Sequence, residues 1–175
     1  MKIKKFSARK RVGNRPVKFG TAIAYTKYQT GIMKNAPPSK PTIYLADDDP
    51  EDLELLVEAF RKLTDNHHLK VVTSGRELFE TLSRLDDDQL PCLIVLDYNM
   101  PGLNGKQVLK YLQASTRYRE IPKVIHTTTD LFTNKDEFIS MGAHEFITKA
   151  TSMKGILNAA KKMLAICDDD IRLSA

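Results

Sequence analysis

The most unusual feature of this 175-residue chain is a run of three aspartates, 47–49, placed directly after an apolar segment. That segment, residues 42–46 (TIYLA), is rich in β-branched and aromatic residues and predicts a buried strand. Two further acidic runs, 86–88 and 168–170, stand among polar or helix-ending residues and are expected to be solvated loop and tail. Only the first run follows a predicted buried strand, where water does not screen the repulsion between like charges. Only this run therefore needs a chemical explanation.

Three other side chains that could do chemistry also end or follow apolar runs, namely Asp97, Thr127 and Lys149. Clustered carboxylates in a partly desolvated pocket repel one another unless a cation joins them, and hard oxygen ligands suit Mg²⁺. A metal ion and an ammonium group can hold the oxygens of a phosphoryl group while a carboxylate attacks in line. The residue types therefore predict a site that accepts a phosphoryl group.

Short apolar runs alternate with segments of helical periodicity from residue 42 onward. The runs that predict strands are 42–46, 69–73, 92–96, 123–127 and 145–148. Between or after them, five helical faces are marked by Leu53, Leu56, Val57 and Phe60; Leu78, Leu82 and Leu85; Val108, Leu109 and Leu112; Phe138 and Met141; and Ile156, Leu157, Ala160 and Leu164. This (βα)₅ pattern predicts an α/β domain, a doubly wound five-stranded parallel sheet with helices on both faces.

In open parallel sheets, ligands bind beyond the carboxyl ends of the strands, where the winding direction reverses. The first expected strand ends at Asp47 and Asp48, and the third ends at Asp97. If these strands are neighbours, the three carboxylates converge on one crevice. Thr127 and Lys149 would join them from the fourth and fifth strands.

Four motifs at four strand ends carry a resemblance to a known family. They are ADDDP after the first strand, LDYNMPGLNG after the third, HTTT after the fourth and TK after the fifth. Together they make residues 41–166 resemble the response-regulator receiver domain of two-component signalling, of the single-domain, chemotaxis-regulator-like type. The resemblance implies a flavodoxin-like fold with strand order 2-1-3-4-5.

The resemblance also assigns roles at the acidic cluster. Asp97 looks like the phosphoacceptor and a metal ligand, Asp48 like a direct Mg²⁺ ligand, and Asp47 like a ligand acting mainly through water. Asn99 would supply a backbone carbonyl to the metal. Asp49 stands before a proline and is expected to be a helix N-cap outside the site.

By the same resemblance, Thr127 looks like the switch hydroxyl and Lys149 like the lysine that contacts the phosphoryl group. Phe146 occupies the place of an aromatic ring that rotates inward on activation, and Thr129 a position that tunes rates. The family usually follows its lysine with a proline in a cis bond, whereas this chain has Ala150. A non-proline cis bond costs ~2.5–4 kcal/mol, so the loop is expected to be either trans and rearranged or strained.

These features predict a phosphorylation-activated signalling switch and not a turnover enzyme. The resemblance implies that a histidine kinase or phosphotransfer protein donates the phosphoryl group to Asp97 with Mg²⁺. Phosphorylation would then change the fourth-helix to fifth-helix surface, which would bind a downstream protein or a second copy of the chain. One rival is a phosphatase of the haloacid-dehalogenase type, but DYNMP lacks the second acid that such enzymes place two residues after the nucleophile.

The N-terminal segment has a different composition from the rest of the chain. Residues 1–40 hold 11 Lys+Arg and no acid, which leaves 16 basic and 22 acidic residues for 41–175. High charge and low apolar content predict a disordered basic extension at 1–40, before a receiver domain at 41–167 and an acidic tail at 168–175. The extension could bind nucleic acid, regulated by the receiver, or contact an acidic partner. Met33 offers an alternative start, which would remove residues 1–32 from the natural product.

The sequence shows neither a secretory signal nor ~18 consecutive apolar residues, so a cytoplasmic protein without membrane contact is expected. The two cysteines, Cys92 and Cys167, have no metal or redox spacing and suggest a reducing compartment. His67 and His68 are expected in an exposed loop, and not in a zinc site. His126 is expected to pack in its strand.

Overall fold

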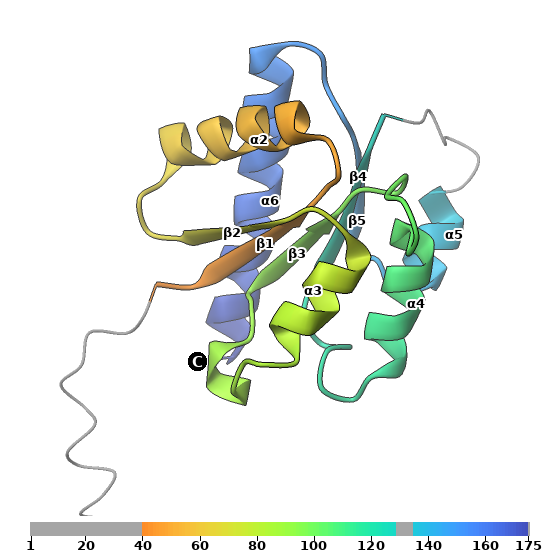
Figure 1. Ribbon diagram of the computed structural model, residues 1–175. Coiled ribbons are helices and arrows are strands. Elements are labelled where there is room, and N and C mark those ends of the chain that lie inside the picture. Colours follow the sequence, from red (N-terminus) through yellow and green to blue (C-terminus); the bar gives the residue numbers. More distant parts are fainter. Residues whose placement is uncertain (1–39, 129–134, 175) are drawn as a thin grey trace, which may run out of the picture. The chain divides into compact units, whose positions relative to one another are not determined.

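The computed structural model describes residues 40–128 and 135–174, which form one five-stranded sheet covered by helices (Figure 1). The basic extension, Thr129 and the rest of the loop after the fourth strand lie outside the described residues. The compact unit that contains the sheet comprises Lys40–Ala175.

All strands of the sheet are parallel and follow the order β2-β1-β3-β4-β5. Their bounds are β1 (Thr42–Ala46), β2 (His68–Val72), β3 (Leu93–Leu96), β4 (Lys123–Thr127) and β5 (Glu145–Thr148). The predicted doubly wound α/β architecture and its flavodoxin-like strand order are confirmed. β1 and β3 are neighbours at the point where the order reverses, so the strand ends that carry the acidic residues lie side by side.

In the described part of the chain, four α-helices and one short 3₁₀ helix connect the strands, and a fifth α-helix follows the last strand. Their bounds are α2 (Pro50–Leu63), α3 (Gly75–Leu82), η2 (Asp87–Gln89), α4 (Gly105–Ala114), α5 (Lys135–Ser140) and α6 (Met153–Ser174). Local chemistry sets where several of them begin. The Asp49 side chain accepts hydrogen bonds from the backbone N–H groups of Glu51 and Asp52, and Pro50 is the first helical residue, so the predicted N-cap is confirmed.

The core consists of two layers, one on each face of the sheet. Alternate strand residues point to opposite faces, so Ile43 and Leu45 pack with α2 and α6, whereas Tyr44 and Ala46 pack with α3 and α4. Figure 1 shows α2 and α6 on one side of the sheet and α3, α4 and α5 on the other. The central strands β1 and β3 are therefore covered on both faces.

The C-terminal helix is longer than the sequence suggested. α6 runs from Met153 to Ser174, so residues 168–174 continue the helix and do not form a separate acidic tail. The reason is that the buried face persists, because Ala160, Met163 and Cys167 repeat at helical spacing and are all fully buried.

The cysteines and His67 also differ from expectation. Cys92 and Cys167 form a disulfide between the segment entering β3 and α6, across a sequence separation of 75 residues. The His67 side chain is only 6% exposed, so it does not lie in an exposed loop. Helix α6 returns along the sheet, which brings its end to the edge where β3 begins, and sequence spacing gave no sign of this proximity.

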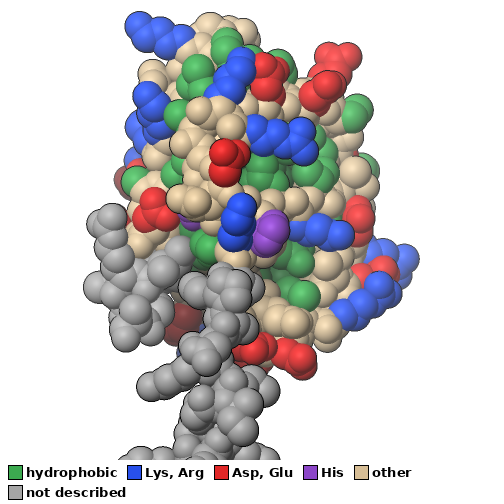
Figure 2. Space-filling view, turned by 90° about the vertical axis from the view of Figure 1, so that its left-hand side faces the viewer, with side chains coloured by type: hydrophobic (Ala, Val, Ile, Leu, Met, Phe, Trp, Pro, Cys, Tyr) green, Lys and Arg blue, Asp and Glu red, His purple; other side chains and the backbone are tan. Residues whose placement is uncertain are grey.

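The face of the molecule shown in Figure 2 is of mixed charge. On the face shown in Figure 2, Lys and Arg side chains alternate with Asp and Glu side chains, and hydrophobic side chains appear in small areas between them. Among the helices of residues 40–128 and 135–174, none is long and apolar enough to cross a membrane.

Candidate functional site

The backbone of the sheet places the acidic residues. The Asp97 N–H donates to the Ala46 carbonyl at 2.8 Å, which continues the β1–β3 pairing by one residue beyond the strands. On the other side of β1, the Asp47 N–H donates to the Val72 carbonyl at 3.1 Å. Asp47 and Asp97 are thus fixed as neighbours at the carboxyl edge of the sheet.

Three carboxylates gather at this edge, as the sequence predicted. Asp47 and Asp97 are buried, with 6% and 5% of their surface exposed, whereas Asp48 is exposed. One oxygen from each of the three lies within 4.8 Å of the others. Burial raises the pKa of Asp47, and hydrogen bonds from Lys149 and from the backbone of Asp49 counteract that rise in part.

Backbone donors orient two of these carboxylates. Oδ1 of Asp47 accepts the Asp49 N–H at 3.1 Å, and Oδ2 of Asp97 accepts the Asn99 N–H at 2.9 Å. Each hydrogen bond restricts rotation of the carboxylate and leaves its other oxygen facing the cluster. Asn99 itself is exposed beside Asp97.

Lys149 reaches the centre of the cluster from the end of β5. Its Nζ lies 2.7 Å from Asp47 Oδ2, 2.8 Å from Asp52 Oδ2 and 3.5 Å from Asp97 Oδ1, and its side chain is 9% exposed. Burial alone would lower the pKa of Lys149, but its bonds to Asp47 and Asp52 outweigh burial and raise the pKa above its usual range. The lysine is therefore a fixed positive charge among buried carboxylates.

Asp52 is a site residue that the sequence did not reveal. It lies in the first turn of α2, not at a strand end, and supplies a fourth carboxylate to the cluster. The cluster therefore contains one more carboxylate than the three that the sequence predicted. The N-cap at Asp49 predicted that Asp52 lies in the first turn of a helix, but not that this turn faces Lys149.

Of the two residues expected to respond to phosphorylation, Thr127 contacts Lys149 of the cluster, and Phe146 packs against α5. Thr127 ends β4, is fully buried, and its carbonyl accepts the Lys149 N–H at 2.8 Å. The ring of Phe146 is half-buried and stacks on Phe138 of α5, with centroids 5.7 Å apart. Phe138 in turn meets Tyr98, which follows Asp97, edge-on at 5.4 Å. An aromatic row therefore connects the segment after β3 with α5 and β5.

Two further expectations concern neighbouring residues. The described residues contain no cis peptide bond, so the bond between Lys149 and Ala150 is trans. His126 is buried as predicted, and burial together with the nearby Lys149 charge lowers its pKa to about 4. It is neutral near pH 7 and is not a proton donor for the site.

The donor set fits a hard divalent cation. Three carboxylates that offer oxygens within 4.8 Å of one another, two of them held by backbone N–H groups, match the oxygen ligation that Mg²⁺ and Mn²⁺ accept. Asp48 is exposed to solvent, which suits Mg²⁺, an ion that usually retains several of its waters. Asp47, Asp48, Asp97 and the backbone of Asn99 are the groups available to hold such an ion.

Comparison with known proteins agrees with this arrangement. A family model described as the response regulator receiver domain matches residues 43–161. The two-component response regulator ARR3 of Arabidopsis thaliana is 27% identical over 154 residues, which cover 83% of this chain but only 64% of ARR3. Response regulator Rcp1 of Synechocystis sp. is 25% identical over 139 residues, which cover 76% of this chain and 92% of Rcp1. The chain thus spans less than two thirds of ARR3.

Solved structures share the fold. The Mn²⁺-bound form of response regulator Rcp1 is 23% identical with a TM-score of 0.63, covering 71% of this chain and 92% of that one. The phosphorylated cyanobacterial phytochrome response regulator RcpA is 25% identical with a TM-score of 0.62, covering 70% of this chain and 89% of that one. One of these two similar proteins is described with a divalent metal and the other in a phosphorylated state.

Proposed function

Because the chain belongs to the response regulator receiver domain family, we propose that it is a signalling switch in which Asp97 accepts a phosphoryl group from phosphohistidine. The histidine would belong to a histidine kinase or a phosphotransfer protein. The observation that carries the proposal is the placement of Asp97, which is buried at the end of a central strand with Lys149 Nζ 3.5 Å from its Oδ1.

In the proposed transfer, phosphorus exchanges its bond to a histidine nitrogen for a bond to an Asp97 oxygen. Asp97 Oδ1 forms the new P–O bond while the P–N bond of the donor breaks, and the leaving imidazole keeps the electron pair and takes up a proton. The Asn99 N–H holds Oδ2, which favours attack by Oδ1. Mg²⁺ held by Asp47, Asp48, Asp97 and the Asn99 carbonyl would neutralise charge on the phosphoryl oxygens.

The phosphoryl group carries a charge of about −1.5 to −2 and replaces the −1 of the Asp97 carboxylate, so the site becomes more negative by roughly 0.5 to 1. Lys149, which in the structure binds Asp47 and Asp52, then has a more strongly charged partner beside Asp97. Thr127, buried next to it, can donate its hydroxyl to another phosphoryl oxygen. The Phe146 ring now stacks on Phe138. Movement of Thr127 toward the phosphoryl group would allow this ring to rotate inward.

The output surface is then the one formed by the fourth and fifth helices of the domain, α5 and α6, with β5 between them. A surface pocket of about 340 Å³ lies here, lined by Lys135, Glu145, Phe146, Ile147, Thr148, Gly155, Asn158, Ala159 and Lys162. Lys135 Nζ and Glu145 Oε1 form an ion pair of 2.7 Å across it. Since Phe146 lines this pocket and touches Phe138, rotation of its ring would reshape the surface that a partner protein or a second copy contacts.

Intact-mass measurement tests the proposal. The chain is incubated with acetyl phosphate or phosphoramidate, with Mg²⁺ or with EDTA. We expect one added phosphoryl group with Mg²⁺ and none with EDTA, and no addition to the Asp97→Ala variant. Equal labelling of that variant would refute the assignment, and multiple turnover of small phosphomonoesters would favour a phosphatase instead.

A second candidate function is nucleic-acid binding by residues 1–40, favoured by their 11 basic and no acidic residues. The mixed charge of the surface in Figure 2 offers no comparable basic area on that face. Retention on DNA or RNA that falls steeply with salt, and is lost when 1–39 are deleted, would establish it. Retention that does not depend on the deletion would exclude the extension as its cause.

A further inference from the structure

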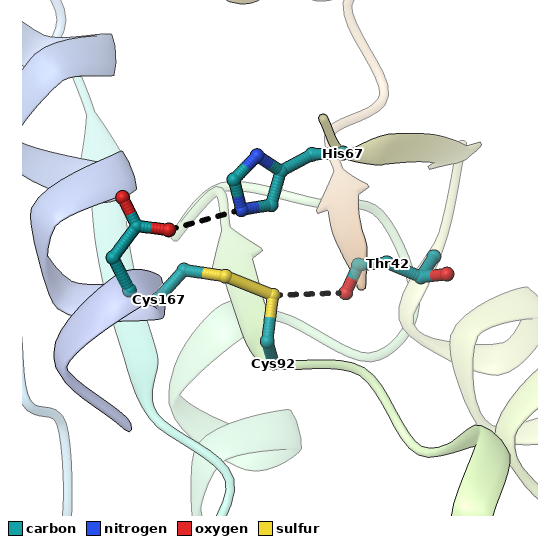
Figure 3. Close-up of a disulfide and its surroundings, with 5 residues drawn as sticks. Thr42, His67, Cys92 and Cys167 are labelled. Carbon is teal, nitrogen blue, oxygen red and sulfur yellow. Dashed lines mark hydrogen bonds and ion pairs between the residues drawn. A yellow bond between two sulfur atoms is a disulfide. The ribbon is translucent and has the colours of Figure 1, made fainter. Parts of the chain in front are cut away.

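A second cluster of metal-binding side chains lies at the opposite edge of the sheet. Cys92 precedes β3, Cys167 belongs to α6, and His67 precedes β2. One ligand atom from each lies within 4.8 Å of the other two. Figure 3 shows the His67 ring facing the disulfide, with the Thr42 carbonyl 3.4 Å from Cys92 Sγ on the other side. Because Asp97 follows the far end of β3, this cluster is separate from the phosphoacceptor site.

His67 is not explained by packing alone. Its side chain is 94% buried, since only 6% is exposed, yet neither ring nitrogen makes a hydrogen bond. Its nearest charged neighbour is Asp168, whose Oδ1 lies 3.3 Å from Nε2 in a geometry that is not a hydrogen bond. A buried polar group without a hydrogen bond costs free energy and calls for a missing partner.

We propose that, when its disulfide is reduced, this cluster binds a divalent cation of the zinc class. Cys92 and Cys167 supply two thiolates, one ring nitrogen of His67 supplies a third ligand, and Asp168 supplies a carboxylate oxygen as the fourth. Two sulfurs, one nitrogen and one oxygen form a tetrahedral donor set that suits Zn²⁺ and not Mg²⁺.

The positions of the ligand atoms allow such a site with small movements. Around a tetrahedral zinc with Zn–S bonds of ~2.3 Å, ligand atoms are separated by about 3.5–3.8 Å. Reduction lets the two sulfurs separate to about 3.8 Å, and the His67 nitrogen, which lies within 4.8 Å of both, then needs an adjustment of about 1 Å. Asp168 Oδ1 already lies 3.3 Å from His67 Nε2. A pocket of about 480 Å³ that His67 lines, together with Lys40, Phe60, Arg61, Thr64, Asp65, His68 and Leu69, provides an approach to the ring.

Disulfide and metal site exclude each other, because each uses the same two sulfurs. Two molecules of a small thiol reduce the bond by exchange, giving two protein thiols and one small-molecule disulfide. Binding of Zn²⁺ then releases one proton from each thiol. The cluster is thus a zinc site in a reducing medium and a covalent link between α6 and the start of β3 in an oxidising one.

Cobalt(II) is the probe, because its absorption distinguishes tetrahedral thiolate ligation from the octahedral oxygen ligation expected at Asp97. The full chain is reduced, freed of reductant under argon, and titrated with Co²⁺ in excess Mg²⁺ to occupy the carboxylate site. We expect one Co²⁺ per chain with a thiolate charge-transfer band, displaced by one equivalent of Zn²⁺. The oxidised chain should show no such band.

Variants identify the ligands. Cys92→Ser should abolish the cobalt band, and His67→Ala should weaken binding by more than the ~10- to 100-fold typical of a lost outer-shell contact, because His67 is a direct ligand. His68→Ala is the matched control, since this exposed neighbour lies outside the cluster, and it should bind as the parent does.

Two results would overturn the proposal. The first is a reduced parent chain that remains folded by circular dichroism but binds no Co²⁺ or Zn²⁺ with thiolate absorption. The second is a band that persists in Cys92→Ser. The first comparison needs no variant, so a folding defect in a variant cannot obscure it.

Discussion

Replacement of Lys149 by methionine tests how the phosphoacceptor site holds its charges. Methionine keeps most of the length and apolar stem of lysine but removes the ammonium group that lies 2.7 Å from Asp47 and 3.5 Å from Asp97. Both carboxylates are buried, so in the absence of metal they would repel each other without compensation. We expect the metal-free variant to be the less stable protein.

The size of the effect follows from burial. Loss of one partner from a buried ion pair typically costs about 3–5 kcal/mol. The Lys149 and Asp47 side chains are 9% and 8% exposed, so that range applies to their pair, whereas Asp52 is 34% exposed and contributes less. Lysine also competes with a cation for Asp47, so we expect Mg²⁺ to bind the variant at least about ten-fold more tightly, equivalent to ~1.4 kcal/mol.

Urea unfolding by circular dichroism and Mg²⁺ titration by calorimetry measure both effects, with EDTA providing the metal-free state. The chain has no tryptophan, which makes fluorescence unsuitable. Lys154→Met is the matched control, because Lys154 is an exposed lysine near the start of α6. If Lys149→Met is as stable as this control without metal and binds Mg²⁺ no more tightly, the electrostatic account of the site is wrong.

Three other predictions concern the fold around the site. Gly105→Ala would place a Cβ 2.3 Å from the Asp97 carbonyl, so we expect a loss of about 1–3 kcal/mol in urea unfolding and slower phosphorylation; unchanged rates would contradict this close contact. Burial lowers the pKa of Lys123 to about 8, below the ~10.4 of an unfolded chain, so the unfolded state binds more protons between these values. The free energy of unfolding should therefore rise with pH across that window in the parent but not in Lys123→Met. If both proteins show the same pH dependence of stability, Lys123 is not its source. Deletion of residues 1–39 should leave Mg²⁺ affinity and phosphorylation unchanged, and a collapse of either would show that the extension supports the receiver.

Much of the fold was predictable because hydrophobic patterning is local. The strands 42–46, 123–127 and 145–148 match their predicted bounds, since each is a short apolar run ended by a polar residue. The last helix was predicted too short, because the acidic run at 168–170 suggested a solvated end. Cys167 stands seven residues, about two helical turns, after Ala160 and continues the buried face of the helix. This spacing indicated a longer helix more strongly than the acidic run indicated a helix end.

Proximity between distant segments was less predictable. The meeting of Asp47, Asp97 and Lys149 was foreseen because the carboxyl ends of parallel strands share one edge. Asp52 was not, because its contact with Lys149 depends on the direction in which α2 leaves β1. The approach of Cys167 to Cys92 likewise depends on the length of α6, which apolar periodicity alone had left uncertain.

The most direct test of the central claim is to identify the carboxylate that becomes phosphorylated. Borohydride reduces an acyl phosphate to the alcohol, so a phosphorylated aspartate becomes homoserine and is located by peptide mass spectrometry. After treatment with acetyl phosphate and Mg²⁺, we expect homoserine at Asp97 alone. Homoserine at Asp48 or Asp47, with Asp97 unmodified, would contradict the account.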